Sequence, residues 1–292
     1  MWKTEETTAV NDGKELPHTG NGVSMSRIKL IASDLDGTLL LNGAQNLQPQ
    51  TCGLIRRLWE EKGILFLAAS GRQVDNLERL FAPVKDEIAY LCENGCLCFC
   101  GGKKIHQEYM DHSLGQSIIR TIQATEGAEV LLSGVHTSYI QPKDMSYYYH
   151  MRDVVGNNVT LVPDILQTEE PYFKVSLYEA GGLHDVSWWQ QKFGDQATVV
   201  TGGNEWLDCM PKGVNKATAL DQILRYLGIA PDEVIAFGDN LNDREMLEMV
   251  GIPVAVETAK KEIIRICGRT TDTVEHALEK ILRDEFPAQP VS

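Results

Sequence analysis

Asp34-Leu35-Asp36-Gly37-Thr38 decides the fold of this chain, and it follows directly on the apolar run Ile28-Lys29-Leu30-Ile31-Ala32-Ser33. The apolar run predicts a buried β-strand. Because residues two apart in an extended chain point the same way, Asp34 and Asp36 are expected to lie close together. Two unneutralised carboxylates repel by roughly 1 kcal/mol in water, and by more in a drier site. The pair indicates a compensating cation, a shared proton or a reaction; a solvated Asp-Gly turn is the alternative.

Composition excludes several classes of partner. The chain has 292 residues, of which 43% are hydrophobic, so it is long enough for two modest globular domains. Its net charge of −14 argues against nucleic acid and against anionic membranes, since no basic surplus exists to neutralise phosphates. The longest apolar runs, such as Ile64 to Ala69, have the length of a core strand and not of a membrane span. We expect a monomer or a small homo-oligomer with a small-molecule partner.

The cysteines predict buried thiols. Four of the seven lie close together, at Cys92, Cys96, Cys98 and Cys100, but their spacing does not match the paired CxxC motifs of zinc sites. Strand alternation places the last three on one face, as suits a buried hairpin.

The N-terminal segment does not resemble a secretory signal peptide. Met1 to Ser24 is polar, and it contains no hydrophobic region of a secretory signal. We expect residues 1–25 to be a disordered leader, or sequence upstream of a start at Met25, and we expect reduced cysteines and a cytoplasmic location.

Apolar runs and helical periods alternate at both ends of the chain. Predicted strands at 28–33, 64–69 and 88–91 are separated by predicted helices, which gives a β-α-β-α-β series. The same pattern returns after residue 208, with a helix from Asn215 to Leu227 and strands at 234–237 and 252–256. This order predicts an α/β fold, with a Rossmann-like, doubly wound parallel sheet covered by helices on both faces.

The middle of the chain follows a different pattern. Between residues 111 and 208, short strands of alternating character are mixed with two helices, which predicts an inserted α+β module whose open sheet has one solvated face. The predicted division is therefore a core formed by residues 26–110 and 209–292, with an insert at 111–208.

Chemistry-bearing side chains follow the core strands. In an open parallel sheet, ligands bind outside the carboxyl ends of the strands. The sequence places a carboxylate cluster, a hydroxyl beside a free backbone amide, and one ammonium there. These groups belong to Asp34, Asp36, Ser70, Gly71, Lys216, Asp239, Asn242 and Asp243.

With these motifs in order, the chain resembles the haloacid dehalogenase superfamily of phosphatases, and more narrowly the Cof-type subgroup with a type IIB cap. The resemblance extends from Ile28 to the C-terminus. Its motifs are Asp34-Leu-Asp36-Gly-Thr38, Ala69-Ser70-Gly71-Arg72, Glu93-Asn94-Gly95, Gly213-Val214-Asn215-Lys216 and Gly238-Asp239-Asn240-Leu-Asn242-Asp243.

The resemblance implies a catalytic role for each acidic residue. Asp34 would be the nucleophile that forms an aspartyl-phosphate, and Asp36 would be the general acid and then the general base. Asp34, the backbone carbonyl of Asp36, and Asp239 would hold Mg²⁺, which prefers such an all-oxygen set.

The remaining site residues would bind or support the phosphate. The binding set implied by the resemblance is Leu35, Ser70, Gly71, Lys216 and Asn242. The supporting set around it is Asp243, Arg72 and Asn94, in which Arg72 pairs with a supporting carboxylate and Asp243 orients Lys216 or the metal shell.

The implied function is Mg²⁺-dependent hydrolysis of small phosphorylated metabolites, either sugar phosphates or phosphorylated cofactors. Two alternatives share the scaffold, namely a phosphosugar mutase and a weakly catalytic regulatory phosphosugar-binding protein. A signalling receiver also uses an acidic cluster, a hydroxyl and a lysine. Receivers lack the second aspartate, here Asp36, and a large insert, so both features argue against that class.

Several positions keep two interpretations. Thr38 either braces the loop or contacts phosphate, Asn94-Gly95 is either a tight turn or part of the site, and Lys212 is an alternative to Lys216. Aromatic residues of the insert are more typical of core than of a substrate platform. The same segment's histidines, His136, His150 and His184, lack paired spacing and are expected to be surface or packing residues.

The C-terminal segment departs from the family pattern. Thr258-Ala259 stands where the family has Asn-Ala, Ile264 lies near the position of a usual lysine, and Asp272-Thr273-Val274 replaces Asp-Gly-Val. We expect these changes to affect substrate fit and not the type of reaction.

Overall fold

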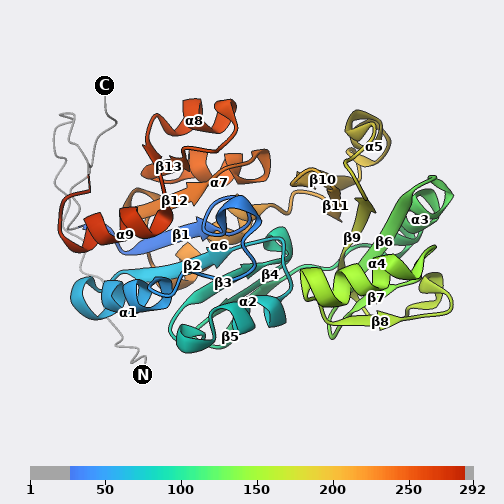
Figure 1. The fold of residues 1–292 in the computed structure, drawn as a ribbon, viewed down its shortest axis with the longest axis horizontal. Coiled ribbons are helices and arrows are strands. Elements are labelled where there is room, and N and C mark those ends of the chain that lie inside the picture. The colour runs from blue at the N-terminus through green and yellow to red at the C-terminus, as the bar shows by residue number, and fades with distance from the viewer. Residues whose placement is uncertain (1–26, 287–292) are drawn as a thin grey trace, which may run out of the picture.

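The computed structural model describes residues 27–286 as two β-sheets, each accompanied by helices (Figure 1). The predicted leader at 1–25 lies outside these residues. Eight strands of the described chain form the first sheet, in the order β14 (Thr270–Thr271), β13 (Ile252–Val256), β12 (Val234–Gly238), β1 (Leu30–Asp34), β2 (Leu65–Ala69), β3 (Ala89–Cys92), β4 (Leu97–Cys100) and β5 (Lys103–Gln107).

Helices cover both faces of the first sheet. Strands β14 to β3 are parallel, and β4 and β5 extend the sheet in antiparallel pairing. Right-handed crossovers that run in opposite directions along a sheet place their helices on opposite faces. In agreement, α1 packs against α9, while α6, α7 and α8 contact one another in series. The doubly wound core is confirmed. Its helices are α1 (Thr51–Lys62), α2 (Val74–Leu80), α6 (Lys216–Leu227), α7 (Arg244–Met249), α8 (Lys261–Cys267) and α9 (Val274–Leu282).

The strand order reverses between β1 and β12. From β1 the chain proceeds to β2 and β3 on one side, and from β12 it proceeds to β13 and β14 on the other. Such a reversal leaves a crevice at the carboxyl ends of the two strands, where open α/β sheets bind their ligands. The residues that follow β1, β2 and β12 are therefore the candidates for ligand binding.

The second sheet is mainly antiparallel and belongs to the middle of the chain. We call the elements from α3 to β11 the insert. Its sheet has the order β10 (Ala197–Gly202), β11 (Trp206–Pro211), β9 (Tyr172–Glu179), β6 (Ala128–Gly134), β7 (Ser138–Ile140) and β8 (Val159–Leu161), and its helices are α3 (His112–Ala124), α4 (Met145–Tyr149) and α5 (Val186–Phe193).

The expectation of one solvated sheet face is wrong for the central strands. Every residue of β6 and β9 is buried. On one face, Val175 packs in a cluster that includes Ile118 of α3 and Trp189 of α5. On the other face, Leu131 and Tyr178 pack with residues of α4 and of the following helical turn. Alternating apolar and polar residues do not reveal this burial, because the polar side chains bind other parts of the protein: Lys174 reaches the Gly71 carbonyl of the core, and Glu129 accepts from the Lys143 and Asp144 amides of the insert.

The boundaries of the insert stay a prediction. Strand β5 ends at Gln107 and α3 begins at His112, while β11 pairs within the second sheet up to Pro211. We therefore propose that the chain returns to the core between Pro211 and Lys216, slightly later than residue 208.

The clustered cysteines are buried free thiols, as predicted. Strand β4 lies between β3 and β5; Cys98 and Cys100 are buried within it, and Cys96 is buried just before it. Burial raises the pKa of the Cys98 thiol to about 12, so this thiol stays protonated at neutral pH.

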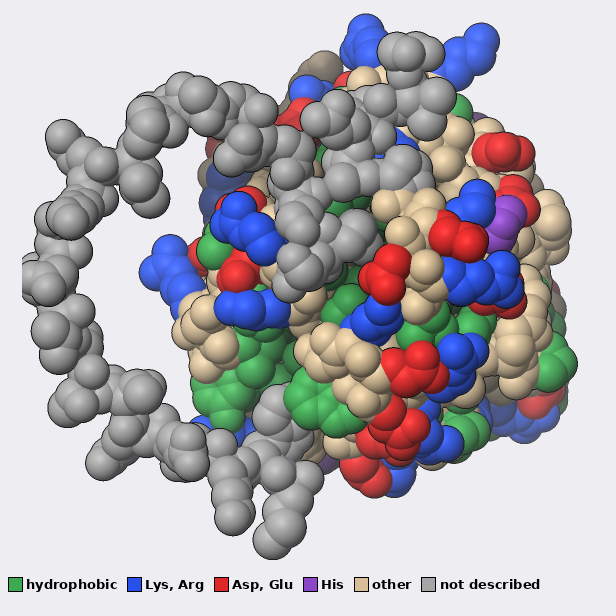
Figure 2. All heavy atoms as spheres, turned by 90° about the vertical axis from the view of Figure 1, so that its left-hand side faces the viewer, with side chains coloured by type: hydrophobic (Ala, Val, Ile, Leu, Met, Phe, Trp, Pro, Cys, Tyr) green, Lys and Arg blue, Asp and Glu red, His purple; other side chains and the backbone are tan. Residues whose placement is uncertain are grey.

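One face of the surface mixes both signs of charge. On the face shown in Figure 2, basic and acidic side chains are interspersed over the described residues. No helix among residues 27–286 combines the length and the apolar character needed to cross a membrane.

A short turn joins the first sheet to the start of α6. The 3-10 turn η4 (Glu93–Gly95) follows β3, and Gly95 adopts a φ of 113°. A Cβ atom on Gly95 would lie 2.5 Å from the backbone oxygen of Asn215, the N-cap residue of α6. The close approach requires glycine, and it ties the η4 turn to the residue that precedes Lys216.

We predict that Gly95→Ala destabilises the protein more than Gly102→Ala does. Both glycines have positive φ, which costs alanine about 1–2 kcal/mol. Only Gly95 adds a backbone clash, because a Cβ on Gly102 meets nothing within 4 Å. Urea unfolding of both variants measures the difference, and equal losses of unfolding free energy would contradict the packing argument.

Candidate active site

A cavity of about 370 Å³ lies between the carboxyl edge of the first sheet and the insert. Asp34, Asp36 and Ser70 line it from the core, and Lys174, Trp206 and Asp208 line it from the insert. The cavity thus brings together residues from the loops after β1 and β2 and from strands of the second sheet.

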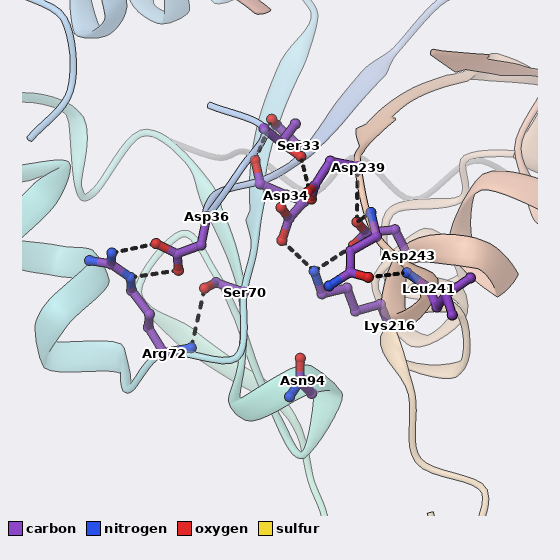
Figure 3. Close-up of polar contacts among 12 residues, drawn as sticks. Ser33, Asp34, Asp36, Ser70, Arg72, Asn94, Lys216, Asp239, Leu241 and Asp243 are labelled. Atoms are coloured by element: carbon purple, nitrogen blue, oxygen red, sulfur yellow. Dashed lines mark hydrogen bonds and ion pairs between the residues drawn. The ribbon is translucent and has the colours of Figure 1, made fainter. Parts of the chain in front are cut away.

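Asp34 and Lys216 form the buried centre of the site. Lys216 is the first residue of α6, which begins at the Asn215 cap, and this start directs its side chain to the end of β1. The Lys216 ammonium lies 2.5 Å from Asp34 Oδ1 and 2.6 Å from Asp243 Oδ1. Figure 3 shows these side chains, together with Asp239, pointing toward one another.

Both carboxylate oxygens of Asp243 have partners within the protein. Its Oδ2 accepts hydrogen bonds from the backbone amides of Asp239 and Asn240, and its Oδ1 accepts from Lys216. Asp239 accepts a hydrogen bond from Thr38 Oγ1 at 3.2 Å. Asp34 Oδ2, by contrast, is buried with no hydrogen-bond partner among residues 27–286. Thr38 therefore braces Asp239, and Asp34 Oδ2 is left for a group that the protein itself does not supply.

The site has more carboxylates than it has ammonium groups. Asp34, Asp239 and Asp243 offer oxygen atoms within 4.8 Å of one another, and Lys216 neutralises only one charge. Burial and the neighbouring Asp243 raise the pKa of Asp34 above its usual range and that of Asp239 to about 6. Burial opposes the charge of Lys216, but the two carboxylates outweigh it and raise its pKa. The orphaned Asp34 oxygen and the excess negative charge fit a hard divalent cation.

The phosphate-binding candidates lie beside Asp34, at the end of the neighbouring strand. Asp34 pairs with Ala69 across β1 and β2, so Ser70 is the next residue along that edge. Ser70 is buried, and its Oγ accepts a hydrogen bond from the Arg72 amide at 3.2 Å. A Cβ on Gly71 would press against the Asn94 side-chain amide at 3.0 Å, so Gly71 keeps this turn open.

Asp36 turns away from this centre toward Arg72. The Arg72 guanidinium donates from Nε to Asp36 Oδ2 at 2.8 Å and from Nη2 to Asp36 Oδ1 at 2.5 Å (Figure 3). Sequence reasoning expected Arg72 to pair with a supporting carboxylate, and the structure pairs it with the proposed general acid instead. Two parallel bonds fix the orientation of that carboxyl group.

The other predicted residues take varied positions. Asn94 belongs to the η4 turn, its side chain donates to Asp208 Oδ2 at 2.6 Å, and it lines the cavity; its role in the site stays a prediction. Asn242 lines the cavity. The Leu35 side chain is buried and has no polar atom. A hydrogen bond from Leu35 to a ligand would therefore have to come from its backbone amide. Lys212 donates to the Gly194 backbone oxygen in the insert and not to Asp34.

Sequence reasoning missed part of the cavity. Lys174 and Asp208 face it from β9 and β11, and Trp206 and His150 form a wall in which His150 stacks on Tyr178. His150 and Trp206 are therefore cavity residues as well as packing residues. The available signal was one lysine within the mainly apolar strand 172–178 and one aspartate within 206–209.

Comparisons with known proteins show which family the chain matches. The model of the haloacid dehalogenase-like hydrolase family matches residues 31–280. The chain is 28% identical over 280 residues to the 5-amino-6-(5-phospho-D-ribitylamino)uracil phosphatase YbjI of Escherichia coli K12, covering 89% of this chain and 98% of the relative.

Solved structures share the whole fold. A crystal structure of a Eubacterium rectale protein has 29% sequence identity and a TM-score of 0.76, covering 88% of this chain and 99% of the other. The subclass IIB sugar phosphatase BT4131 has 20% identity and a TM-score of 0.73, covering 86% of this chain and 98% of the other, which shows likeness of fold. The chain therefore belongs to the haloacid dehalogenase-like hydrolase family, in its Cof-type branch, and is a phosphatase.

Proposed function

We propose that this phosphatase uses Asp34 as a nucleophile and Mg²⁺ as a cofactor to hydrolyse phosphate monoesters of small metabolites. The observation that carries the proposal is the buried Asp34 carboxylate, which Lys216 contacts on one oxygen while the other oxygen has no partner among the described residues. A carboxylate held in this way is oriented for attack, and Lys216 supplies positive charge in a chain whose net charge is −14.

The residues support a two-step reaction. Asp34 attacks phosphorus while the bond to the leaving oxygen breaks, and Asp36 gives its proton to that oxygen. Asp36 then accepts a proton from water, which attacks the aspartyl-phosphate and releases inorganic phosphate and free Asp34. Ser70, the amides of Leu35 and Gly71, and Asn242 are proposed to bind phosphate oxygens. Asp243 holds Lys216, and Arg72 and Asn94 support Asp36 and the turn after β2.

The proposed metal ligands are Asp34, the backbone carbonyl of Asp36, and Asp239. When bound, Mg²⁺ would offset the repulsion between the acidic cluster and an anionic phosphate and would stabilise charge on the transferring group. Asp243 is proposed as a supporting residue and not as a main ligand, because Lys216 and two backbone amides already use three of its roughly four acceptor positions.

The cavity suggests the nature of the leaving group. Polar side chains of Lys174, Ser176 and Asp208 form one part of its lining, and Trp206 and His150 form an aromatic part. Such a lining suits a leaving group that combines hydroxyl groups with a planar or apolar portion. We propose sugar phosphates or phosphorylated cofactors as substrates. The names of YbjI and BT4131 describe a phosphorylated ribitylaminouracil and sugar phosphates, respectively.

A phosphosugar mutase or a regulatory phosphosugar-binding protein on this scaffold receives no specific support from the site. Analysis of the product separates them, because a mutase returns an isomerised sugar phosphate and a sensor returns no product. A cytoplasmic location is proposed from the free cysteines of the described chain. The monomer or small homo-oligomer also stays a prediction.

We predict that Asp34→Asn lowers phosphate release by about a thousandfold or more, because the amide cannot act as the nucleophile. Release from a panel of phosphorylated metabolites, with and without Mg²⁺, measures the effect. Asp221→Asn is the matched control, since Asp221 lies on the same helix as Lys216 and pairs with Arg225 on the surface. Metal-independent turnover, or a fully active Asp34→Asn protein, would refute the mechanism.

We predict that Mg²⁺ stabilises the protein more at about pH 7.5 than at about pH 5. Raised pKa values of Asp34 and Asp239 mean that the metal-free folded state binds more protons than the unfolded chain. Its stability therefore falls as pH rises from about 4, the unfolded value, through the Asp239 value of about 6. Mg²⁺ binds the ionised carboxylates and offsets this loss.

Thermal unfolding with and without Mg²⁺ at the two pH values tests this dependence. Asp239→Asn removes one of the titrating groups, so it should reduce the pH dependence of the Mg²⁺ effect. An equal rise in melting temperature at both pH values in the parent protein would contradict the proposed metal ligands.

We predict that Arg72→Lys lowers kcat by about tenfold with a smaller change in KM, because a lysine cannot hold both oxygens of Asp36. Arg57→Lys is the control, since Arg57 also donates twice to a carboxylate, Glu61, but on the exposed face of α1. Steady-state kinetics measure both variants. Equal activity of Arg72→Lys and the parent would show that the pairing with Asp36 has no catalytic consequence.

A further inference from the structure

A buried polar cluster that lines part of the cavity joins the insert to the core. We define the inter-sheet cluster as Glu93 and Asn94 of η4 together with Lys174, Ser176 and Asp208 of the insert. All five residues are buried. Glu93 and Asn94 have φ values of 50° and 56°, a left-handed backbone that surrounding contacts must hold in place. This backbone points both side chains at the insert.

Lys174 is the only ammonium group of the inter-sheet cluster. Its Nζ lies 3.0 Å from Asp208 Oδ2 and 3.2 Å from Glu93 Oε2. Burial opposes its charge, but Asp208 and Glu93 outweigh this effect and raise its pKa, so Lys174 stays protonated. Asp208 also accepts hydrogen bonds from Asn94 at 2.6 Å and from Ser176 at 2.5 Å, which fixes its position.

The third contact of Lys174 reaches the turn after β2. Lys174 Nζ donates to the backbone oxygen of Gly71 at 2.8 Å. The Gly71 carbonyl and the Arg72 amide belong to one planar peptide group, so fixing the oxygen also fixes the direction of the N–H. That N–H donates to Ser70 Oγ at 3.2 Å. A chain of two hydrogen bonds and one peptide plane therefore links Lys174 to the Ser70 hydroxyl.

This series of contacts restricts the direction in which the Ser70 hydroxyl can donate a hydrogen bond. Because Ser70 Oγ accepts the Arg72 N–H, its own hydrogen must point in another direction, where it is free to donate. A cation on the Gly71 carbonyl polarises the peptide and strengthens the Arg72 N–H as a donor. The insert thus influences Ser70 without touching it.

We propose that Lys174 is a positioning residue for phosphate binding, which fixes the Gly71–Arg72 peptide from the insert and so orients the Ser70 hydroxyl toward a phosphate oxygen. The inference rests on the proposed function, because that function makes Ser70 a phosphate ligand. It also implies that the phosphate site is complete only while the insert is seated on the core.

A direct contact between Lys174 and the leaving group is the competing explanation, because Lys174 also lines the cavity. The two roles differ in their dependence on the substrate. A leaving-group contact affects only esters that carry the group it binds. A positioning role affects every ester by the same factor, and it also affects inorganic phosphate, which has no leaving group.

The test is Lys174→Met in the full-length protein with Mg²⁺. Calorimetric binding of inorganic phosphate and kcat/KM for three esters with unlike leaving groups are measured. We expect phosphate affinity and all three kcat/KM values to fall by a similar factor of about ten, the effect of one charge-assisted hydrogen bond. Lys143→Met is the matched control, because Lys143 also donates to backbone oxygens of the insert, at Ile122 and Thr125, and should change neither value.

A double-mutant cycle with Ser70→Ala tests the route. If Lys174 acts through Ser70, Lys174→Met should cause little further loss of phosphate affinity in the Ser70→Ala protein. Additive losses, or unchanged phosphate affinity with a loss confined to one ester, would overturn the assignment. A parent protein that binds phosphate but hydrolyses no ester would contradict the proposed function instead.

Lys174→Met leaves Asp208 and Glu93 without their cation, so folding is checked by circular dichroism and thermal unfolding. If the single variant does not fold, Lys174→Met/Asp208→Asn removes a charge of each sign and takes its place in every measurement. Unchanged phosphate affinity in that folded double variant would likewise overturn the proposal.

Discussion

The contact between the Lys216 ammonium and the carboxylates of Asp34 and Asp243 is the interaction on which the site depends. It joins the end of β1, the start of α6 and the turn after β12, and each of its members is buried. Buried charges are costly unless each has a partner, so the three segments must assemble together. The reversal of strand order between β1 and β12 allows this assembly, because it brings the two carboxyl ends to one crevice.

The sequence predicted the core better than the insert, for physical reasons. Core strands are buried on both faces, so 28–33 and 64–69 read as continuous apolar runs, and the helix from 216 to 227 has a clear cap at Asn215 and a glycine after its end. The insert's central strands carry polar side chains that face another part of the protein. A local pattern cannot distinguish such burial from exposure to water.

The same limit applies to the site. Motifs close to the strand ends were sufficient to nominate Asp34, Ser70 and Asp239, because the sheet itself places them. Lys174 and Asp208 were missed, because their proximity to Glu93 depends on how the insert sits on the core, and no short motif encodes that placement. The carboxylate partner of Arg72 was also open, because the sequence does not show which acidic side chain lies within its reach.

The polar character of the inter-sheet cluster affects how the insert separates from the core. Breaking contacts among Lys174, Asp208 and Glu93 brings water to charged groups and not to hydrocarbon. Exposure of apolar surface raises heat capacity, whereas exposure of polar surface lowers it. The contribution of this cluster to the heat-capacity change of separating the insert from the core should therefore be negative. Unfolding of a hydrophobic core has a positive heat-capacity change, so the two free energies should curve in opposite directions with temperature.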